Sequence, residues 1–591
     1  LLKERGELAF IVTKMWIKLD YGEKLREIIS REKAIRLLLD FGHNQVFENP
    51  LAKTSDSKTK SPITYTMILI LTKEQSQVVR YGRVLRLQKT LDQLNAIHNP
   101  EQARRFELWV ADFPADSLSS DPWVFLTDEE KAIVGKIHRN APALGTVAVI
   151  FQGLRTSDDK VYILQKLQDL GNAYKVYSKV LDQEIVLEKD LLKPVLRGRG
   201  IKKWLVYDTP ELILFPYEIR IEGKQRKAVL IEAEELQEKY PRIWKYLLLN
   251  KERLEARENK KWKNSPKWYE FGRIQNLEKM DLPKLLNPDV QNVPTFALDA
   301  EGKYYFTGGY GTTIRDEYRD KISLPYLVGL LNSSLLDWRL KQISKERKGG
   351  YYSYEGKFIR ELPTKLPSTD KEKALAEEIE TTVEDIIDLL KRHHLVMSLW
   401  REWSERLGKK KLALRKLVEK WEKGVGRVPQ ERLFFTDVRV MSDEGTEYDG
   451  FELEVEGGTL RVLGREGDIL MPILELEGKD ELLEHVYFAI LELLESRKKV
   501  KTLGDILNKT TVPTIDGDPS ETARIVRVVK EKAGAKHLTS FAKLVRENEA
   551  YLDALVFRLY GLNKEEARLV LEGLGKSQDY IEAVIDHLFR P

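Results

Sequence analysis

Three apolar runs near the N-terminus, with one helix-patterned stretch among them, constrain the fold of this chain most strongly. The runs are Glu7 to Val12, Ala34 to Phe41 and Thr64 to Leu71. Asp20 to Arg31 carries apolar residues at helical spacing between the first two runs. Short continuous apolar runs are typical of strands that are buried on both faces, as in parallel sheets. This segment therefore predicts half of an α/β sheet.

The open edge of such a sheet is costly to expose, because its backbone groups and its apolar faces lack partners. We therefore expect further strands, supplied either upstream or by a partner chain. The first residues, Leu1 and Leu2, point to the same expectation, because no Met precedes them. We expect this chain to be a fragment, or to have its true start further upstream.

Composition excludes several classes of protein. The chain of 591 residues contains no Cys, which excludes a disulfide scaffold, a thiolate nucleophile, an iron–sulfur cluster and a cysteine zinc site. A reducing cytosol permits this composition, and we expect a cytoplasmic location. No apolar run reaches the ~18 residues of a membrane span, so we expect no membrane partner.

Residues 1–75 resemble the end of a methyltransferase catalytic domain. The runs LLKERGELAFIVTKMW, IRLLLDFGHNQVFENP and TYTMILIL look like adenine-N6 DNA methyltransferases, of the Eco57I-like type IIG restriction–modification enzymes and of the TaqI type. The resemblance implies the C-terminal half of a class I methyltransferase Rossmann-like sheet. It also implies that Phe47 stacks on the flipped-out target adenine. From the residues alone, a loop Phe packed against the sheet is the alternative.

The motifs that carry methyl transfer in that family are absent from this sequence. The family uses an NPPY motif for the target amino group and a glycine-rich loop for S-adenosylmethionine. Two glycine clusters, at Gly308 to Gly311 and at Gly198 to Gly200, lack the strand–turn–helix context that such a loop needs. We expect no catalytic residue and no cofactor in this chain. S-adenosylmethionine would bind the intact enzyme, and the missing catalytic half is an expected partner.

Residues 151–367, after a linker at 76–150, resemble the TaqI-like specificity domain. The matching stretches are Phe151 to Leu164, Leu191 to Trp204 and Leu324 to Pro367, in the order that the family has them. Short apolar runs mixed with Gly, Pro and aromatic residues predict a mixed α+β fold here. The resemblance implies a target recognition domain that binds double-stranded DNA.

The positive charge of the chain is concentrated in this region. The whole chain has a net charge of +4, whereas residues 191–360 hold 33 Lys plus Arg and 23 Asp plus Glu, a net of +10. Localised basic charge is typical of a polyanion-binding surface. Three clusters of basic residues, mixed with Gly and aromatic residues, are the candidate DNA contacts; for each, a solvated face is the alternative. They are Arg197, Arg199, Lys202 and Lys203; Lys260, Lys261, Lys263, Lys267 and Arg273; and Lys341, Lys345, Arg347, Lys348, Tyr351 and Lys357.

The C-terminal part predicts helices with one small sheet. A capping box from Thr369 to Glu372 opens a long helical hairpin over residues 368–430, with a break near Gly408. Period-two patterning predicts a small β-meander over 431–478, and residues 479–591 are helical. Tyr551 to Gly575 resembles the closing helix of type IIG enzymes, and we expect it to pack against the specificity domain.

No metal site is expected. Type IIG enzymes often carry a nuclease, which needs acidic residues clustered with a Lys around a metal ion. The nearest arrangements are Asp208 with Glu218 and Lys224, and Asp449 with Glu452 and Glu454; both fit the polar faces of strands. His393 and His394 are adjacent and face different directions on a helix, which disfavours a shared metal.

Together these features predict the sequence-recognition portion of an N6-adenine DNA methyltransferase from a type IIG restriction–modification system. The alternative is a stand-alone, non-catalytic DNA specificity subunit that partners a separate methyltransferase chain. A decayed gene product that folds poorly is a third interpretation.

Overall fold

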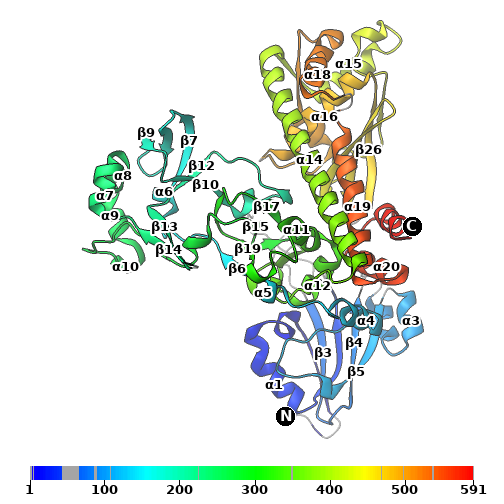
Figure 1. The fold of residues 1–591 in the computed structure, drawn as a ribbon. Helices are drawn as coiled ribbons and strands as arrows, with labels where there is room; N and C mark the ends of the chain where they lie inside the picture. The colour runs from blue at the N-terminus through cyan, green and yellow to red at the C-terminus, as the bar shows by residue number, and fades with distance from the viewer. Residues whose placement is uncertain are drawn as a thin grey trace.

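The computed structural model describes residues 3, 6–42, 66–84, 90–106, 108–223, 225–347, 350–466, 469–496, 498–535 and 538–589. These residues form an N-terminal sheet, a central region with a protruding lobe, and a helical shaft that ends in a small module (Figure 1). None of the helices in these ranges is apolar over enough length to cross a lipid bilayer. The chain is a mixed α/β protein with several separate sheets.

The three predicted N-terminal strands are present, and two more strands join them. The sheet has the order β1-β3-β2-β4-β5. Its strands are β1 (Glu7–Thr13), β2 (Ile35–Asp40), β3 (Thr66–Thr72), β4 (Val78–Val84) and β5 (Leu108–Pro114), and helix α1 (Glu23–Arg31) lies against it. The sheet thus extends beyond residue 75, into the stretch that we expected to be a linker.

The expected parallel arrangement is wrong for most of this sheet. β3 runs antiparallel to both β1 and β2, and β4 runs antiparallel to β5; β2 and β4 are a parallel pair. The continuous apolar run of β2 reflects burial on both faces, because Leu38 and Leu39 point into two different hydrophobic cores. Burial on both faces gives the same sequence pattern whichever way the neighbouring strands run.

β1 is an edge strand whose apolar side chains remain in solvent. Leu8, Phe10 and Ile11 are 38%, 48% and 56% exposed. Leu25 and Ile28 of α1, the next α-helix along the chain, are also exposed. An apolar strand with an unpaired edge is ordinarily covered or paired in a native assembly.

The central region has the mixed α+β character that the sequence predicts. A six-stranded sheet contains β18 (Tyr305–Thr307), β10 (Leu192–Arg197), β12 (Glu211–Leu214), β7 (Ile163–Asp169), β8 (Ala173–Ser178) and β9 (Gln183–Glu188), in that order. A five-stranded sheet contains β11 (Trp204–Leu205), β17 (Ala297–Asp299), β15 (Lys284–Asn287), β19 (Tyr310–Ile314) and β6 (Ala148–Gln152). The first sheet, the hairpin β13 (Tyr217–Glu222) and β14 (Gln225–Leu230), and helices α7 (Ala233–Lys239), α8 (Pro241–Leu249), α9 (Lys251–Glu255) and α10 (Arg257–Lys260) form the protruding lobe (Figure 1).

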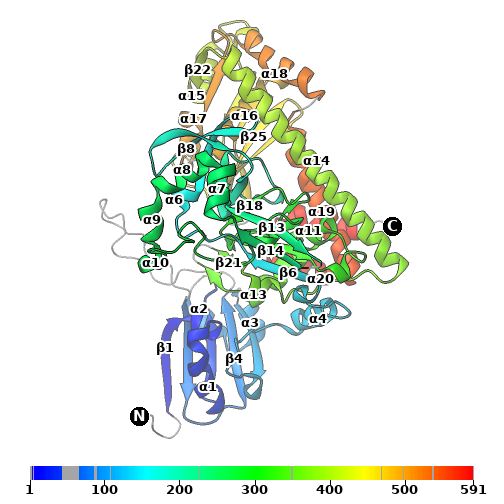
Figure 2. The same cartoon turned by 60° about the vertical axis from the view of Figure 1, so that its left-hand side comes forward.

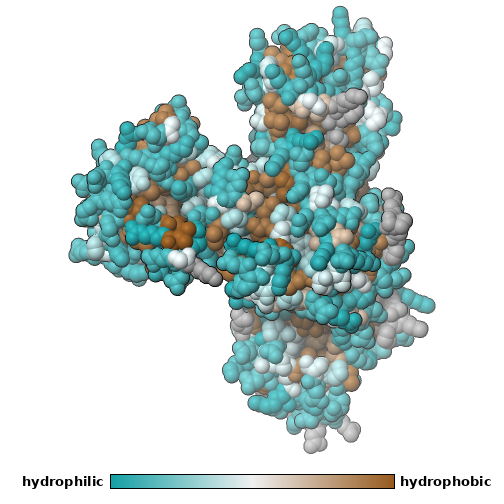
Figure 3. Space-filling model, viewed as in Figure 1, coloured by the Kyte–Doolittle hydropathy of each residue, from teal (hydrophilic) through white to brown (hydrophobic). Residues whose placement is uncertain are grey.

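Two hydrophobic cores lie on either side of the connection between the lobe and the body. The lobe has its own core, which runs from Phe151 to Phe306 in sequence. The second core includes the five-stranded sheet, α11 (Leu324–Asn332), α12 (Ser334–Ile343) and the C-terminal helices. Figure 3 shows the lobe standing out from the body, with a concave side between them.

The helical shaft consists of two long helices that pack along each other. α14 (Asp370–Leu407) begins at the predicted capping box and ends at Gly408, and it packs against α19 (Ser540–Tyr560). In the segment 368–430, where we expected a helical hairpin with a break near Gly408, a short strand, β22 (Lys410–Ala413), lies between α14 and α15 (Leu414–Gly424). Figure 2 shows α14 as a continuous rod that reaches the module at the far end of the molecule.

The closing segment packs against the central region, as predicted. Asp553 of α19 is buried and accepts hydrogen bonds from the backbone N–H and the hydroxyl of Ser334, at 2.7 and 2.5 Å. The Tyr560 hydroxyl donates to the carbonyl oxygen of Pro363 at 2.8 Å. α20 (Lys564–Gly573) and α21 (Gln578–Phe589) complete this contact.

The module at the end of the shaft contains the small sheet that the sequence predicts. Its strands are β23 (Asp437–Val440), β26 (Ile469–Glu477), β25 (Thr459–Glu466) and β24 (Gly450–Glu456), in spatial order. Helices α16 (Asp480–Glu495), α17 (Leu503–Lys509) and α18 (Pro519–Ala533) and strand β27 (Thr511–Thr514), which pairs with β22, pack with it around a third core.

A buried histidine in this module leads us to expect that its stability depends on pH. His485 of α16 accepts a hydrogen bond from Trp400 Nε1 at 3.0 Å and contacts the carbonyl oxygen of Pro513 at 2.6 Å. This pairing requires the neutral ring, and burial lowers the pKa of His485 to about 4.

The unfolded chain therefore binds more protons than the folded chain between about pH 6.5 and about pH 4, so stability falls as the pH falls through this window. We expect a loss of about 3 kcal/mol in the unfolding free energy of the module across it. Urea unfolding followed by Trp fluorescence at several pH values measures it. A His485→Phe variant should lose this component of the pH dependence, and an unchanged slope in that variant would contradict the assignment.

Candidate nucleic-acid interface

A groove runs between the lobe and the body at the point where β6 ends. It consists of two hollows of about 710 and 750 Å³ that share Gln152, Arg155 and Asp289. The first hollow is lined by residues 152–159, Glu258, Arg273, Asp289 and residues 307–309. The second is lined by Gln152, Arg155, Asp289, Val290, Tyr310, Arg347, Tyr351 and Glu355. Because the two hollows share three lining residues, they are adjacent, and together they are called the groove.

A glycine turn shapes the wall of this groove. Gly309 has a φ of +115°, which L side chains rarely adopt, and a Cβ there would overlap the carbonyl oxygen of Asn287. The carbonyl of Gly309 accepts a hydrogen bond from the backbone N–H of Gly153 at 3.2 Å. The glycines at 308–311, which lack the context of a cofactor loop, therefore bring the β18–β19 turn against the end of β6.

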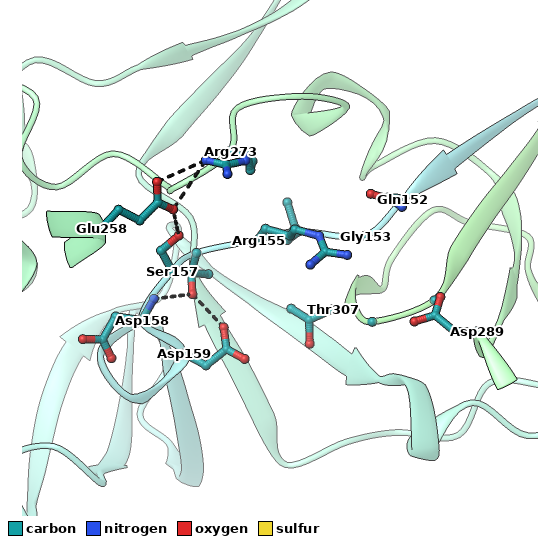
Figure 4. Close-up of a pocket in the computed structure, with 14 residues that line it drawn as sticks. Gln152, Gly153, Arg155, Ser157, Asp158, Asp159, Glu258, Arg273, Asp289 and Thr307 are labelled. Atoms are coloured by element: carbon teal, nitrogen blue, oxygen red, sulfur yellow. Dashed lines mark hydrogen bonds and ion pairs between the residues drawn. The ribbon is translucent and has the colours of Figure 1, made fainter. Parts of the chain in front are cut away.

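Ion pairs hold most of the charged side chains in the first hollow. Arg273 Nη1 lies 3.2 Å from Glu258 Oε2, and Glu258 Oε1 accepts a hydrogen bond from the Ser157 hydroxyl at 2.6 Å. The hydroxyl of Thr156 donates to Asp159 Oδ1 at 2.6 Å (Figure 4). In the lobe below them, Arg257 is buried and donates to the carbonyl oxygens of Leu254, Thr156, Trp268 and Glu270, so it fixes the backbone that carries this hollow.

The second hollow reaches the N-terminal sheet. It is bordered by the hairpin of β20 (Glu346–Arg347) and β21 (Tyr351–Ser353). Arg347 donates to Ser353 at 2.9 Å and to Glu355 at 3.1 Å. The preceding residue, Glu346, lies 3.3 Å from Nζ of Lys14, which also pairs with Asp40 at the end of β2. The hairpin that borders the second hollow is therefore joined to the N-terminal sheet through Lys14.

The first predicted basic cluster is split by the structure. Arg197 ends β10 beside Thr307 of the groove wall, but its Nε donates to Glu211 at 3.0 Å. Lys202 is exposed. Lys203 lies 2.7 Å from Glu549 of α19 and over the ring of Trp204, so it joins the central region to the shaft. The side chain of Arg199 lies outside what the structure describes.

The second predicted cluster lies on the surface of the lobe. Lys260, Lys261, Lys263 and Lys267 are exposed. The aromatic residues between them, Trp262 and Trp268, are 2% and 4% exposed and belong to the lobe core. These tryptophans are therefore unavailable for stacking on bases, whereas the lysines face solvent. Arg273, the last member of this cluster, lines the groove.

The third predicted cluster contributes Arg347 and Tyr351 to the groove; Tyr351 is 42% exposed. Lys341 is half-buried and pairs with Asp337 at 2.8 Å, and Lys345 is half-buried at the base of the hairpin. Lys357 is exposed, with its Nζ 5.1 Å from the ring centroid of Phe358. Lys348 and the predicted stacking residue Phe47 lie outside the described residues.

Three groove residues escaped the sequence analysis. Gln152, Arg155 and Asp289 are common to both hollows, yet none belongs to a basic cluster. Arg155 lies within the stretch Phe151 to Leu164 that matches the opening hairpin of the TaqI-like domain. That stretch was the available signal. No sequence signal pointed to Asp289, because a single acidic residue after Pro288 is typical of an ordinary turn.

The acidic groups considered for a nuclease do not converge. Asp208 accepts from Lys303 at 3.1 Å and from Tyr304 at 2.5 Å, while Glu218 pairs with Arg220 at 2.8 Å. Lys224 lies outside the described residues. Glu452 lies 2.7 Å from Arg546. Within the described ranges, no group of three His, Asp or Glu side chains is placed to hold a metal ion.

Two parts of the chain match known protein families. Residues 193–364 match the TaqI-like C-terminal specificity domain, and residues 1–47 match the Eco57I restriction-modification methylase family. The resemblance recognised in the sequence is thereby confirmed. The groove lies within or beside the first match, because Glu258, Arg273, Asp289 and Arg347 fall inside it and Gln152 and Arg155 precede it.

Particular relatives agree with these matches. The chain is 27% identical over 398 residues to the type II restriction enzyme and methyltransferase RM.Eco57I of Escherichia coli. This match covers 65% of this chain and 37% of that protein. It is 23% identical to the type II methyltransferase M.BstVI of Geobacillus stearothermophilus, over 64% of this chain and 62% of that one. The chain thus spans between about one third and three fifths of these relatives. Among solved structures, the type IIL restriction-modification enzyme MmeI in complex with DNA is 12% identical to this chain, with a TM-score of 0.36. The match covers 65% of this chain and 42% of that chain, and a similarity this low supports no inference about function.

Proposed function

We propose that this chain is the DNA sequence-recognition portion of an N6-adenine DNA methyltransferase from a type IIG restriction–modification system. One observation carries the proposal: residues 193–364, which match the TaqI-like specificity domain, coincide with the basic region at 191–360 and border the groove. A groove beside a localised excess of positive charge suits a double-stranded polyanion. We place the protein in the cytoplasm, where its substrate would be.

The intact enzyme would transfer a methyl group from S-adenosylmethionine to an adenine in a specific duplex site. The N-terminal sheet would belong to the catalytic domain, and the exposed apolar residues of β1 support this assignment, because another part of that domain would cover them. The chain contains neither an NPPY motif nor a glycine loop for the cofactor. The catalytic half would therefore be a partner, within the same polypeptide or in another. Phe47 remains the proposed stacking residue.

The predicted DNA contacts divide into two groups. Arg273, Arg347 and Tyr351 line the groove and would lie closest to the bases. Exposed lysines on the lobe surface would contact phosphates, which position the duplex but carry no sequence information directly. Lys203 and Lys341 pair with acidic groups inside the fold, and we assign them a structural role first.

A stand-alone DNA specificity subunit is the second candidate function. It is favoured by the self-contained core of the lobe and by the absent methyl-transfer motifs. The coding sequence immediately before Leu1 distinguishes the two functions. An NPPY motif in frame there would support one polypeptide, whereas a start codon there, with NPPY encoded by a neighbouring gene, would support a separate subunit.

Selection from a random duplex library tests the shared core of both functions. We expect the purified chain to enrich a defined sequence motif. We also expect no methylation of the enriched DNA when the chain alone receives S-adenosylmethionine. Duplex binding without any preferred motif would contradict the recognition function, and adenine methylation by the chain alone would contradict our account of the missing catalytic half.

A further inference from the structure

One arginine of the groove, Arg155, has no hydrogen bond or ion pair between its guanidinium and the residues that the structure describes. Arg273 pairs with Glu258, and Arg347 with Glu355 and Ser353. The guanidinium of Arg155, by contrast, makes no hydrogen bond or ion pair with any residue that the structure describes, although Arg155 lines both hollows. Figure 4 shows this side chain extending into the hollow, away from Glu258.

The backbone on either side of Arg155 is held firmly. Its carbonyl oxygen accepts from the N–H of Arg273 at 3.1 Å, and the N–H of Leu154 donates to the carbonyl of Phe306 at 2.8 Å. Gly153 packs so closely on Phe306 that a Cβ would come within 2.7 Å of its ring. The backbone is thus fixed, and none of the Arg155 side-chain donors is used by a hydrogen bond within the described part of the chain, so these donors can bind a ligand in the groove.

Asp289 faces the same space from the opposite element. The carbonyl oxygen of Asp289 accepts a hydrogen bond from the N–H of Tyr354 at 2.8 Å. Burial raises the pKa of the Asp289 carboxyl, and the nearby Glu355 acts in the same direction, while Arg155 opposes them. A carboxylate repels DNA phosphates. If DNA binds in the groove, we therefore expect the carboxylate of Asp289 to accept a hydrogen bond from a donor group of the DNA.

We propose that Arg155 and Asp289 determine sequence specificity: Arg155 reads the edge of a guanine, and Asp289 accepts a hydrogen bond from the amino group of a cytosine. This proposal rests on the proposed DNA-binding function. Arginine binds O6 and N7 of guanine with two parallel hydrogen bonds, and a carboxylate suits the N4 amino group of cytosine in the major groove. The pair is set at the centre of the groove, between the lobe and the hairpin that touches the N-terminal sheet.

An Arg155→Ala variant tests the first half. Selection from the random duplex library should return the wild-type motif with one guanine relaxed, and the discrimination at that position should fall roughly 5- to 150-fold. Because the side chain is exposed, thermal stability should stay unchanged. If the variant instead binds all sequences equally more weakly and keeps the whole motif, Arg155 contacts a phosphate and the proposal is wrong.

An Asp289→Asn variant tests the proposed role of Asp289, and its effect on non-specific DNA affinity should be opposite in sign to the effect of removing an arginine. Removing a negative charge should tighten binding to non-specific duplex DNA, while the preference for one cytosine declines. Unchanged cytosine preference would overturn the role of Asp289.

Arg392→Ala is the matched control, because Arg392 is an exposed arginine of the shaft that pairs with Asp388. This control should leave the motif intact. A wild-type chain that enriches no motif contradicts the proposed function itself, whereas a wild-type motif that survives both groove variants contradicts the present inference alone.

Discussion

Raising the salt concentration from about 50 to about 200 mM should weaken binding of this chain to duplex DNA by roughly 10³-fold. Each neutralised phosphate releases counterions, and the logarithm of affinity falls by about 0.9 per contact for each tenfold rise in salt. Among the predicted contacts, six lysines are exposed and form no ion pair with the residues that the structure describes. They are Lys202, Lys260, Lys261, Lys263, Lys267 and Lys357. About six phosphate contacts give the expected slope. Fluorescence anisotropy with a labelled duplex across a salt series measures it.

Two lysines of the lobe allow a matched test of this slope. Lys263→Ala combined with Lys267→Ala should make the slope shallower by about two and leave the preferred motif unchanged. Lys371→Ala combined with Lys373→Ala removes the same charge from exposed positions of α14 and should have no effect on the slope. A wild-type affinity that is insensitive to salt would show that the basic region does not contact DNA.

Replacing Asp299 by Ala should lower the unfolding free energy by about 3–5 kcal/mol. Asp299 and Lys284 form a buried ion pair at 2.6 Å, with side chains 2% and 0% exposed. Burial lowers the pKa of Lys284, and Asp299 opposes that shift. Without Asp299 the lysine is left as a buried charge with two carbonyl partners, those of Met280 and Leu282. Urea unfolding measures the loss.

The same substitution should also disturb the groove. Asp299 accepts hydrogen bonds from the backbone N–H groups of Lys303 and Tyr304 at 3.0 and 3.1 Å, and this turn leads into β18 and the glycine turn. DNA affinity of the Asp299→Ala variant should therefore fall at temperatures where it remains folded. Glu301→Ala, an exposed position in the same turn, is the control and should change neither stability nor affinity. Equal stability of the two variants would contradict this account.

The sequence predicted where the N-terminal strands lie but not how they pair. The apolar runs of β2 and β3 reveal burial, and burial is a local property of each strand. Strand direction depends on which partners the chain finds, which is a property of the whole sheet. β4 escaped prediction because Arg80 and Arg83 interrupt its apolar residues; Arg80 lies 2.7 Å from Asp112 across the pair.

The candidate site was predictable as a region and not as a set of contacts. The net charge of a segment does not show which cations are paired with anions in the fold. The structure pairs Arg197, Lys203 and Lys341 with acidic residues that are distant in sequence or one helical turn away. The interleaved Trp262 and Trp268 fill the lobe core. Arg155 is the opposite case. It lies outside every basic cluster, and only the folded chain shows that its guanidinium makes no hydrogen bond or ion pair with the described residues.

The length of the shaft is fixed jointly by its two helices, because they pack along each other. α14 has 38 residues, which corresponds to about 57 Å at ~1.5 Å per residue, and it packs along α19. One residue inserted into α14 alone would rotate everything beyond it by about 100° and break its register with α19. A change in the separation between the far module and the groove would therefore need matched insertions in two segments more than a hundred residues apart, of about seven or about eleven residues, which keep the rotational phase to within about 20°.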